Sequence, residues 1–360
     1  GHTDPVTAKT ATSVLRYRED EVVAVYDSNH RGATSQSLLG VGDVPVIGTL
    51  EEAPDANMLQ IGIAPPGGKS PESWRPIILH AIERKMSVVS GLHDFLNDDE
   101  EFAAAARQHG AELVDVRAAG RGFKSIARRV GLREECFRVH TVGHDCSIGK
   151  MVTSIELANG LQSRGHRAKF LATGQTGIMV SGDGLPLDCI VADFVSGAAE
   201  KLVLDAQDDH DVVVVEGQGS LVHPSYSGVT LSLLHGCWPH ALILGYEVLR
   251  ERVTGVEHVL IPPLTTIRDL YETMAGLQQP CRVIGVSMNS RRVSPEEAER
   301  EREKVRSELG VPVCDIFRHG CDDLLDAAVR CADLISSVFG PNGRAERDRH
   351  PVVEMALVEL

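Results

Sequence analysis

The sequence predicts an α/β protein of two domains, each built on a mostly parallel sheet. Short apolar runs alternate with helical patterns along most of the chain, which is typical of βαβ units. The alternation is interrupted by a charged, glycine-containing stretch at residues 117–135 and then restarts. A length of 360 residues also suits two domains, at about 100–200 residues each.

The first part of the chain contains five short apolar runs that predict strands. A helix start at residues 49–52 and helical spacing at residues 74–85 lie between them. This order predicts a Rossmann-like domain over residues 3–130. The predicted strands are residues 21–26, 44–48, 58–64, 87–91 and 112–116.

The second part repeats the pattern and predicts a domain over residues 131–340, with a tail at 341–360. The run 211–215 is almost wholly apolar, as expected for a central strand buried on both faces. Helices are predicted from about residue 149, over 194–202 and over 295–309, the last with a solvated, charge-laced face. The predicted strands are 137–142, 168–172, 211–215, 241–244, 282–286 and 312–316.

Composition excludes several classes of protein. Apolar residues make up 42% and charged residues 24%, which is ordinary for a globular chain, and no apolar run approaches the ~20 residues that span a bilayer. A net charge of −15 argues against a general nucleic-acid-binding surface. Eight scattered cysteines without a CxxC pair or a signal peptide predict reduced thiols in a cytoplasmic protein.

The strongest chemical signal is a glycine-bounded loop between a predicted strand and a predicted helix. Such a loop turns backbone N–H groups toward phosphate oxygens, the helix N-terminus adds its dipole, and Lys150 neutralises the terminal phosphate. Five residues separate the two glycines instead of four, and Met151 stands where Ser or Thr normally binds Mg²⁺. The alternative is a chance glycine-rich turn. The predicted phosphate-binding residues are Gly143, His144, Asp145, Cys146, Ser147, Ile148, Gly149, Lys150 and Met151.

Acidic residues near predicted strand ends are candidate metal ligands. Glu216 ends the most apolar strand, where a P-loop protein places a carboxylate for Mg²⁺. Asp188 or Asp193 is the candidate for a second carboxylate. The alternative for Glu216 and Asp193 is helix capping. Together with the loop, these residues predict a P-loop NTPase-like domain.

Polar loops after the strands supply candidates for substrate binding. Gln175 and Thr176 lie in a loop rich in Gly and Asp, and Tyr226 follows His223 in a polar loop. His223 is the candidate general base, and Asn289 is the candidate for reading a nucleotide base. The alternatives are plain turns, a structural histidine and an ordinary polar loop.

The loop and the Val-Glu-Gly-Gln-Gly strand end resemble the dethiobiotin synthetase and cobyrinate amidase branch of P-loop proteins. That branch has a Gly-x-Asp-x-x-x-Gly-Lys loop and a strand-end Glu that binds Mg²⁺. The resemblance therefore implies a magnesium role for Glu216. Met151 departs from its pattern, because Thr or Ser normally follows the loop lysine.

A longer resemblance covers residues 9 to about 335. Its segments are similar to one family, long catalogued as a domain of unknown function, that includes the D-glutamate N-acetyltransferases. The resemblance implies acetyl transfer from acetyl-CoA to the amino group of D-glutamate, in D-amino-acid catabolism beside a dipeptide-epimerase-like enzyme. The similar segments are residues 9–18, 61–75, 90–96, 143–151, 193–200 and 216–236.

The two resemblances lead to different reactions. In acetyl transfer, the catalytic candidates are Lys150, Glu216 and His223. The candidates for binding the substrate carboxylates are Arg268, Arg291 and Arg292, and the loop holds phosphates of CoA or of a separate nucleotide. The alternative is an ATP- and Mg²⁺-dependent enzyme that activates a carboxylate or an amine. A nucleotide sensor without catalysis is a third reading. A homo-oligomer with no nucleic-acid or membrane partner is expected in each case.

Overall fold

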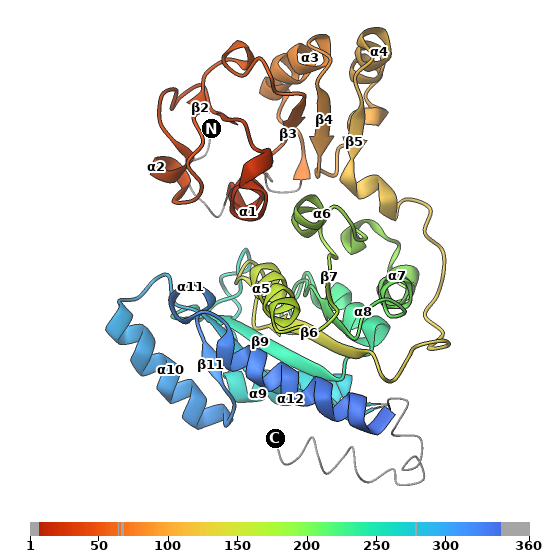
Figure 1. Ribbon diagram of the computed structural model, residues 1–360, viewed down its shortest axis with the longest axis vertical. Helices are drawn as coiled ribbons and strands as arrows, with labels where there is room; N and C mark the ends of the chain where they lie inside the picture. The colour runs from red at the N-terminus through yellow and green to blue at the C-terminus, as the bar shows by residue number, and fades with distance from the viewer. Residues whose placement is uncertain (1–6, 64, 66–67, 278, 340–360) are drawn as a thin grey trace. The chain divides into compact units, whose positions relative to one another are not determined.

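The chain folds into two compact units, each described here by itself. The computed structural model describes residues 7–63, 65, 68–277 and 279–339. The first unit is Gly1–Arg121 with Gln175–Cys189, and the second is Gly122–Gly174 with Ile190–Leu360 (Figure 1). The sequence placed the boundary at residue 130. The tail predicted at 341–360 lies outside the described residues.

The first unit contains all five predicted strands, but they form two separate parallel sheets. The larger has the order β3-β4-β5, and β1 pairs only with β2. The predicted run 21–26 is mostly not a strand, because Glu19–Glu21 forms a 3-10 turn before it. The strands are β1 (Val25–Tyr26), β2 (Val46–Ile47), β3 (Met58–Gln60), β4 (Ser87–Ser90) and β5 (Leu113–Asp115). The helices are α1 (Lys9–Tyr17), α2 (Ser35–Leu39), α3 (Arg75–Glu83), α4 (Glu100–His109) and α6 (Gln175–Ser181).

Helix α6 joins the first unit although it follows a strand of the second in sequence. The Thr176 hydroxyl hydrogen-bonds that of Thr10 at 2.8 Å, and Gln175 Nε2 donates to Thr10 Oγ1 at 3.3 Å. A Cβ at Gly91 would lie 1.6 Å from Gln175 Oε1, so only glycine allows this contact. The buried polar contacts explain why α6 packs on α1.

The second unit is built on a six-stranded parallel sheet of order β11-β10-β9-β6-β8-β7. All six predicted strands are present. The apolar run 211–215 forms β8, which is wholly buried, as predicted. It is an interior strand between β6 and β7, second from one edge of the sheet. The strands are β6 (Phe137–Gly143), β7 (Ala168–Leu171), β8 (Val212–Val215), β9 (Ala241–Glu247), β10 (Arg282–Asn289) and β11 (Val313–Cys314).

Helices cover both faces of this sheet (Figure 1). Alternate residues of β9 divide between the faces, because strand side chains point to opposite sides in turn. Ala241 and Ile243 pack with α5 and α12, whereas Leu242 and Leu244 pack with α8, α9 and α10. The helices are α5 (Lys150–Ser163), α7 (Ala192–Ala206), α8 (Ser227–Cys237), α9 (Leu264–Ala275), α10 (Pro295–Leu309), α11 (Ile316–His319) and α12 (Asp322–Phe339).

The charged stretch 117–135 is not a free linker, because its second half packs on α7. The Glu200 carboxylate accepts the N–H groups of Arg128, at 2.9 Å, and Arg129, and the Gln207 side chain accepts that of Arg133 at 2.8 Å. The Glu200 carboxylate and the Gln207 amide thus accept backbone N–H groups of a segment that is neither helix nor strand.

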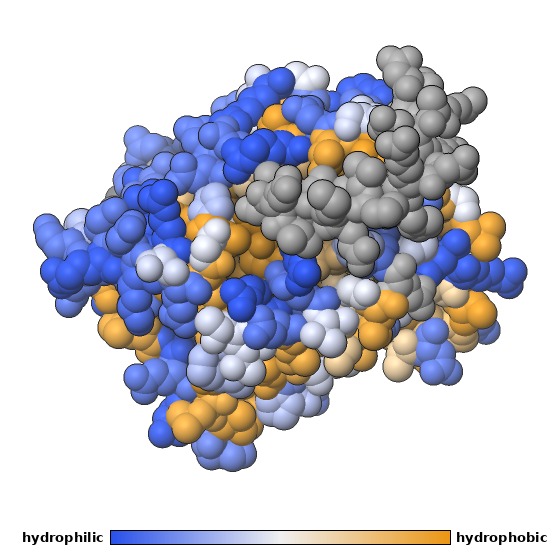
Figure 2. Space-filling model, turned by 90° about the horizontal axis from the view of Figure 1, so that it is seen from below, coloured by the Kyte–Doolittle hydropathy of each residue, from blue (hydrophilic) through white to orange (hydrophobic). Residues whose placement is uncertain are grey.

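The hydropathy of the surface agrees with the ordinary globular composition of the chain. Figure 2 shows one face of the molecule, on which hydrophilic side chains surround smaller apolar areas. Among the described residues, no helix has both the length and the apolar character needed to cross a membrane. All eight cysteines are free thiols, as the sequence predicted.

Candidate functional site

The predicted motifs of the second unit meet at the carboxyl edge of its sheet. The glycine-bounded loop follows β6, Glu216 follows β8, and Glu247 and Asn289 are the last residues of β9 and β10. Because all these strands are parallel and adjacent, their ends share one edge. This edge is where open α/β sheets bind ligands.

The loop has the backbone geometry of an anion site. Ser147 and Gly149 have φ of 53° and 110°, in the left-handed region that turns successive N–H groups the same way. Within the described part of the chain, the N–H groups of Ser147, Ile148 and Gly149 donate to no other residue. Helix α5 begins directly afterwards at Lys150. A phosphate group would accept hydrogen bonds both from these loop N–H groups and from the N–H groups of the first turn of α5.

Lys150 is folded back into the loop. Its side chain is only 7% exposed, and Nζ donates to the Asp145 carbonyl at 2.7 Å. The stem lies against Gly217, where a Cβ would approach Lys150 Cδ to 3.0 Å and the Thr141 carbonyl to 1.8 Å. Burial lowers the pKa of Lys150 to about 8. An arriving phosphate would stabilise the charged form.

The Asp145 carboxylate anchors the segment after β9 to the loop. It is fully buried and accepts from Thr254 N at 3.0 Å, Thr254 Oγ1 at 2.7 Å and Arg250 at 3.0 Å. Burial acts to raise the pKa of Asp145, but these hydrogen bonds outweigh it and the pKa is lowered. Asp145 therefore holds the loop in shape and does not point an oxygen toward a phosphate.

An ion network extends from Asp145 along the strand ends. Arg250 also pairs with Glu247, whose carboxylate lies 2.6 Å from Arg291 Nε and 3.2 Å from Arg292 Nε. Three guanidinium groups against two carboxylates leave one positive charge in excess beside the loop. Sequence reasoning found Arg291 but missed Glu247, Arg250 and Thr254, although an acid at the end of β9 was a readable signal.

Two hydrogen bonds tie the loop to the ends of β10 and β9, one from Asn289 and one to the loop residue His144. Asn289 Nδ2 donates to the Ile148 carbonyl at 3.2 Å, so this predicted base-reading residue contacts the loop. His144 Nε2 accepts the N–H of Glu247 at 3.0 Å. Burial lowers the pKa of His144 to about 3, which keeps the ring neutral and able to accept.

His223 is fixed by hydrogen bonds at both ring nitrogens. Nδ1 accepts the N–H of Ser225 at 3.1 Å, so Nε2 carries the proton and donates to the Thr254 carbonyl at 3.2 Å. The ring is 1% exposed and packs on Tyr226, which is half exposed. To act as the predicted general base, His223 would have to give up one of these bonds.

The residues predicted to hold Mg²⁺ do not form the ordinary P-loop magnesium site. Met151 offers no hydroxyl, and the nearest one, Thr153 Oγ1, is buried between Ser287 Oγ at 2.7 Å and the Gly149 carbonyl at 3.2 Å. Glu216 accepts the N–H groups of Thr173 at 2.8 Å and Gly174 at 3.2 Å. The predicted carboxylate thus caps the turn after β7.

The two aspartates predicted as second ligands have other contacts or are exposed. Asp188 belongs to the first unit, where it pairs with Arg117, and Asp193 is exposed in the first turn of α7. Asp145, Cys146 and His223 do lie near enough to one another for a metal ion. Asp145 Oδ1 accepts the N–H of Cys146 at 2.8 Å, and Asp145 Oδ2 and both ring nitrogens of His223 are occupied by the hydrogen bonds described above.

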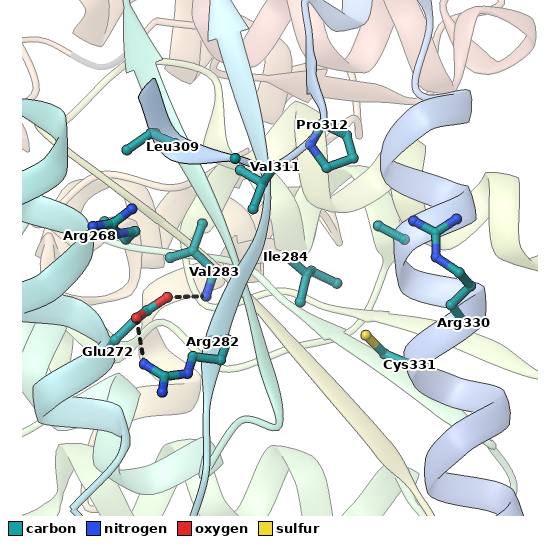
Figure 3. A pocket seen from close by; sticks show the side chains of 12 residues that line it. Arg268, Glu272, Arg282, Val283, Ile284, Leu309, Val311, Pro312, Arg330 and Cys331 are labelled. Carbon is teal, nitrogen blue, oxygen red and sulfur yellow. Dashed lines mark hydrogen bonds and ion pairs between the residues drawn. The ribbon is translucent and has the colours of Figure 1, made fainter. Parts of the chain in front are cut away.

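Of the predicted substrate residues, Gln175 and Thr176 belong to the first unit, and Arg268 lies in the second unit at the end of the sheet opposite the loop. Gln175 and Thr176 are buried against α1 in the first unit. Arg268 lines a pocket of about 310 Å³ at the start of β10, the end opposite Asn289, and eight strand residues separate these ends by about 23 Å. Figure 3 shows Arg268 beside Glu272 and Arg282, with Arg330 on the far side of the pocket.

The fold and the loop define a class: an α/β protein with a Rossmann-like N-terminal domain and a P-loop C-terminal domain. Residues 28–119 match the family model described as the DUF1611_N Rossmann-like domain, and residues 121–325 match the DUF1611_C P-loop domain, a domain of unknown function. The chain belongs to this DUF1611 family, as its resemblance predicted.

Relatives with similar length support the assignment. A protein from Tritonibacter scottomollicae and one from a Pseudoalteromonas species, both named D-glutamate N-acetyltransferase, are 39% and 37% identical; each match covers 90% of this chain and 95% of the relative. A crystal structure of a DUF1611 family protein from Anabaena variabilis is 38% identical, with a TM-score of 0.85, over 90% of this chain and 96% of that one. Cobyrinic acid a,c-diamide synthase from Mycobacterium smegmatis is a distant likeness, at 14% identity and a TM-score of 0.33, over 56% of this chain and 95% of that one.

Proposed function

We propose that this protein is an N-acetyltransferase that moves the acetyl group of acetyl-CoA to the amino group of D-glutamate or a similar acidic D-amino acid. One observation carries the proposal: two relatives of that name are aligned with this chain over 95% of their length. Identities of 37–39% support the class of reaction more strongly than the particular amino acid.

The loop of the second unit is the proposed site for the phosphates of CoA. Its unpaired N–H groups and the start of α5 favour an anion, and Lys150 supplies a cation at the same place. Neither contact needs a metal ion. This agrees with the incomplete magnesium site around Met151 and Glu216.

Arg291 and Arg292 are the proposed partners of the substrate carboxylates. Their side chains are 38% and 49% exposed, and both guanidinium groups share the single oxygen Glu247 Oε1. Each retains free N–H donors, and guanidinium forms bidentate pairs with carboxylates. Of the arginines suggested by the sequence, Arg291 and Arg292 are proposed here and Arg268 is not, because Arg268 lies at the opposite end of the sheet.

The competing reading is an ATP-dependent enzyme that activates a carboxylate or an amine. Lys150 in the loop and Glu216 at the end of β8 favour it, because both occupy positions used for phosphoryl transfer. Against it stand Met151, the occupied Thr153 hydroxyl and the absence of a second carboxylate among the predicted ligands.

A product assay tests the proposal. Purified protein is incubated with acetyl-CoA and D-glutamate, and N-acetyl-D-glutamate is measured by mass spectrometry beside an L-glutamate reaction. We expect product from the D-isomer, and a fall of at least tenfold in kcat/KM for Lys150→Ala because a charge-assisted phosphate contact is lost. The matched control is Lys304→Ala, an exposed lysine paired with Glu301. Product only with ATP present would favour the competing reading.

A further inference from the structure

The first unit contains a cysteine, a histidine and an aspartate arranged as a nucleophile, its base and an orienting group. Cys189 Sγ lies 3.7 Å from His93 Nδ1, and His93 Nε2 lies 3.7 Å from Asp188 Oδ2. These three residues belong to the same compact unit. We propose that Cys189 accepts the acetyl group from acetyl-CoA and passes it to the amine, with His93 as its acid–base partner. This inference rests on the proposed acetyltransferase function.

Each of the three residues has a defined position in the fold of the first unit. His93 follows β4, the middle strand of the three-stranded sheet, so it lies at the carboxyl edge that α/β folds use for ligands. Asp188 and Cys189 are consecutive in the short 3-10 turn Leu187–Cys189. His93 is 44% exposed and Cys189 is half-buried, so a thioester has access to both.

The orientation of the His93 ring is set by its neighbours. Nδ1 faces the thiol as an acceptor, which leaves the proton on Nε2, the nitrogen facing Asp188. Gly68 packs on the ring: its carbonyl accepts the His93 N–H at 2.8 Å, and a Cβ there would lie 2.4 Å from His93 Cδ2. With φ of 64°, Gly68 is a position that favours glycine.

Arg117 holds the acidic member in place. Its Nε and NH2 atoms lie 3.2 and 2.5 Å from Asp188 Oδ2, and its side chain is only 11% exposed. Arg117 is a positioning residue, because it acts on the thiol through Asp188 and the turn that carries Cys189. Burial raises the pKa of Cys189 to about 11, so the resting group is a thiol. A base must therefore remove its proton during attack, and His93 Nδ1, 3.7 Å from the sulfur, is a base within reach.

The reaction balances as two half-reactions. In the first, Cys189 Sγ bonds to the acetyl carbonyl carbon, the carbon–sulfur bond to CoA breaks, and the thiol proton passes through His93 to the departing CoA thiolate. In the second, the neutral amine of the substrate bonds to the same carbon and the bond to Sγ breaks. The amine proton returns through His93 to Sγ, which regenerates the free thiol.

Isotope exchange without any amine tests the covalent step. Labelled CoA is incubated with acetyl-CoA and protein, and label entering acetyl-CoA is measured. The proposal expects exchange by the wild-type protein, its loss in Cys189→Ala, and a decrease of about 10²–10⁴-fold in His93→Gln. Cys321→Ala, a partly buried cysteine in the second unit, is the matched control and should exchange normally. Melting curves show whether each variant is folded.

The outcomes separate this proposal from the proposed function. Absence of exchange in the wild-type protein, or undiminished exchange in folded Cys189→Ala, overturns the role of Cys189. If N-acetyl-D-glutamate still forms, the acetyltransferase function stands and transfer is direct. Exchange that depends on Cys189 without acetylation of D-glutamate supports the acetyl-cysteine step and overturns the choice of substrate.

Discussion

Burial of the Lys150 ammonium group makes phosphate binding depend on pH. Its pKa is lowered to about 8 in the free protein, and the anion binds the protonated form. CoA affinity should therefore be constant below pH 8 and fall above it, by at most tenfold per pH unit. Calorimetric titration of CoA between about pH 7 and 9.5 measures this. Lys150→Met should bind weakly with a flat profile in this range, and a flat wild-type profile would contradict the placement of Lys150 at the phosphates.

Gly217 is required because the backbone of β6 occupies the space of a side chain. A Cβ at Gly217 would lie 1.8 Å from the Thr141 carbonyl, so we expect Gly217→Ala to cost about 3 kcal/mol or more. Gly228 in α8 is the matched control, because no atom lies within 4 Å of its Cβ position, and Gly228→Ala should be neutral or stabilising by up to about 1 kcal/mol. Urea unfolding of both variants measures the difference, and equal stabilities would argue against the close approach.

The elements of the site are held together by buried charges. Asp145→Asn leaves Arg250 without its charge partner in the loop, and breaking a buried pair in this way costs about 3–5 kcal/mol. Asp269→Asn removes an exposed pair with Arg268 and should cost less than about 1 kcal/mol. Thermal melts of the two variants, with and without CoA, measure how much stability each variant loses. A melting temperature unchanged by Asp145→Asn would show that the segment after β9 is not anchored by this carboxylate.

The strands were predictable because a short apolar run between helical segments is typical of a buried strand in a parallel sheet. All eleven strands of the described residues overlap predicted runs. The order of the strands was not predictable. The four valines of β8 indicate that the strand is buried, but they do not indicate which strands lie beside it, because strand order depends on crossover connections that composition does not encode. The loop before Lys150 was found from its glycines. Glu247 was missed because the predicted strand 241–244 stopped short of the end of β9, where Glu247 lies. Its pairs with Arg291 and Arg292 join segments far apart in sequence, which leave no local pattern.

The segment after β7 shows why the candidate residues of the first unit were misread. Asp188 reads as a metal ligand when it is assumed to stay with the P-loop domain. Contacts of Thr176 with Thr10 instead place residues 175–189 in the first unit. Cys189 offered no signal on its own, because its partner His93 is 96 residues earlier in the chain.

At the scale of the molecule, the first unit is discontinuous in sequence. Residues 1–121 alone lack α6 and the turn that carries Asp188, so the buried Thr10 and Arg117 lose their partners. We expect this fragment to melt less cooperatively and at lower temperature than the same fragment joined by a Gly/Ser linker to residues 175–189. A linked segment of scrambled order is the control. Equal melting of all three proteins would show that the unit needs no contribution from 175–189.

The proposed reaction of the whole chain is transfer of acetyl from acetyl-CoA to D-glutamate, with no need for ATP or magnesium. The most direct measurement is the initial rate of CoA release with D-glutamate present, in EDTA and again with Mg²⁺ and ATP. We expect equal rates in both conditions, with N-acetyl-D-glutamate formed in equal amount to CoA. A reaction that stops in EDTA, or that releases ADP in step with product, would contradict it.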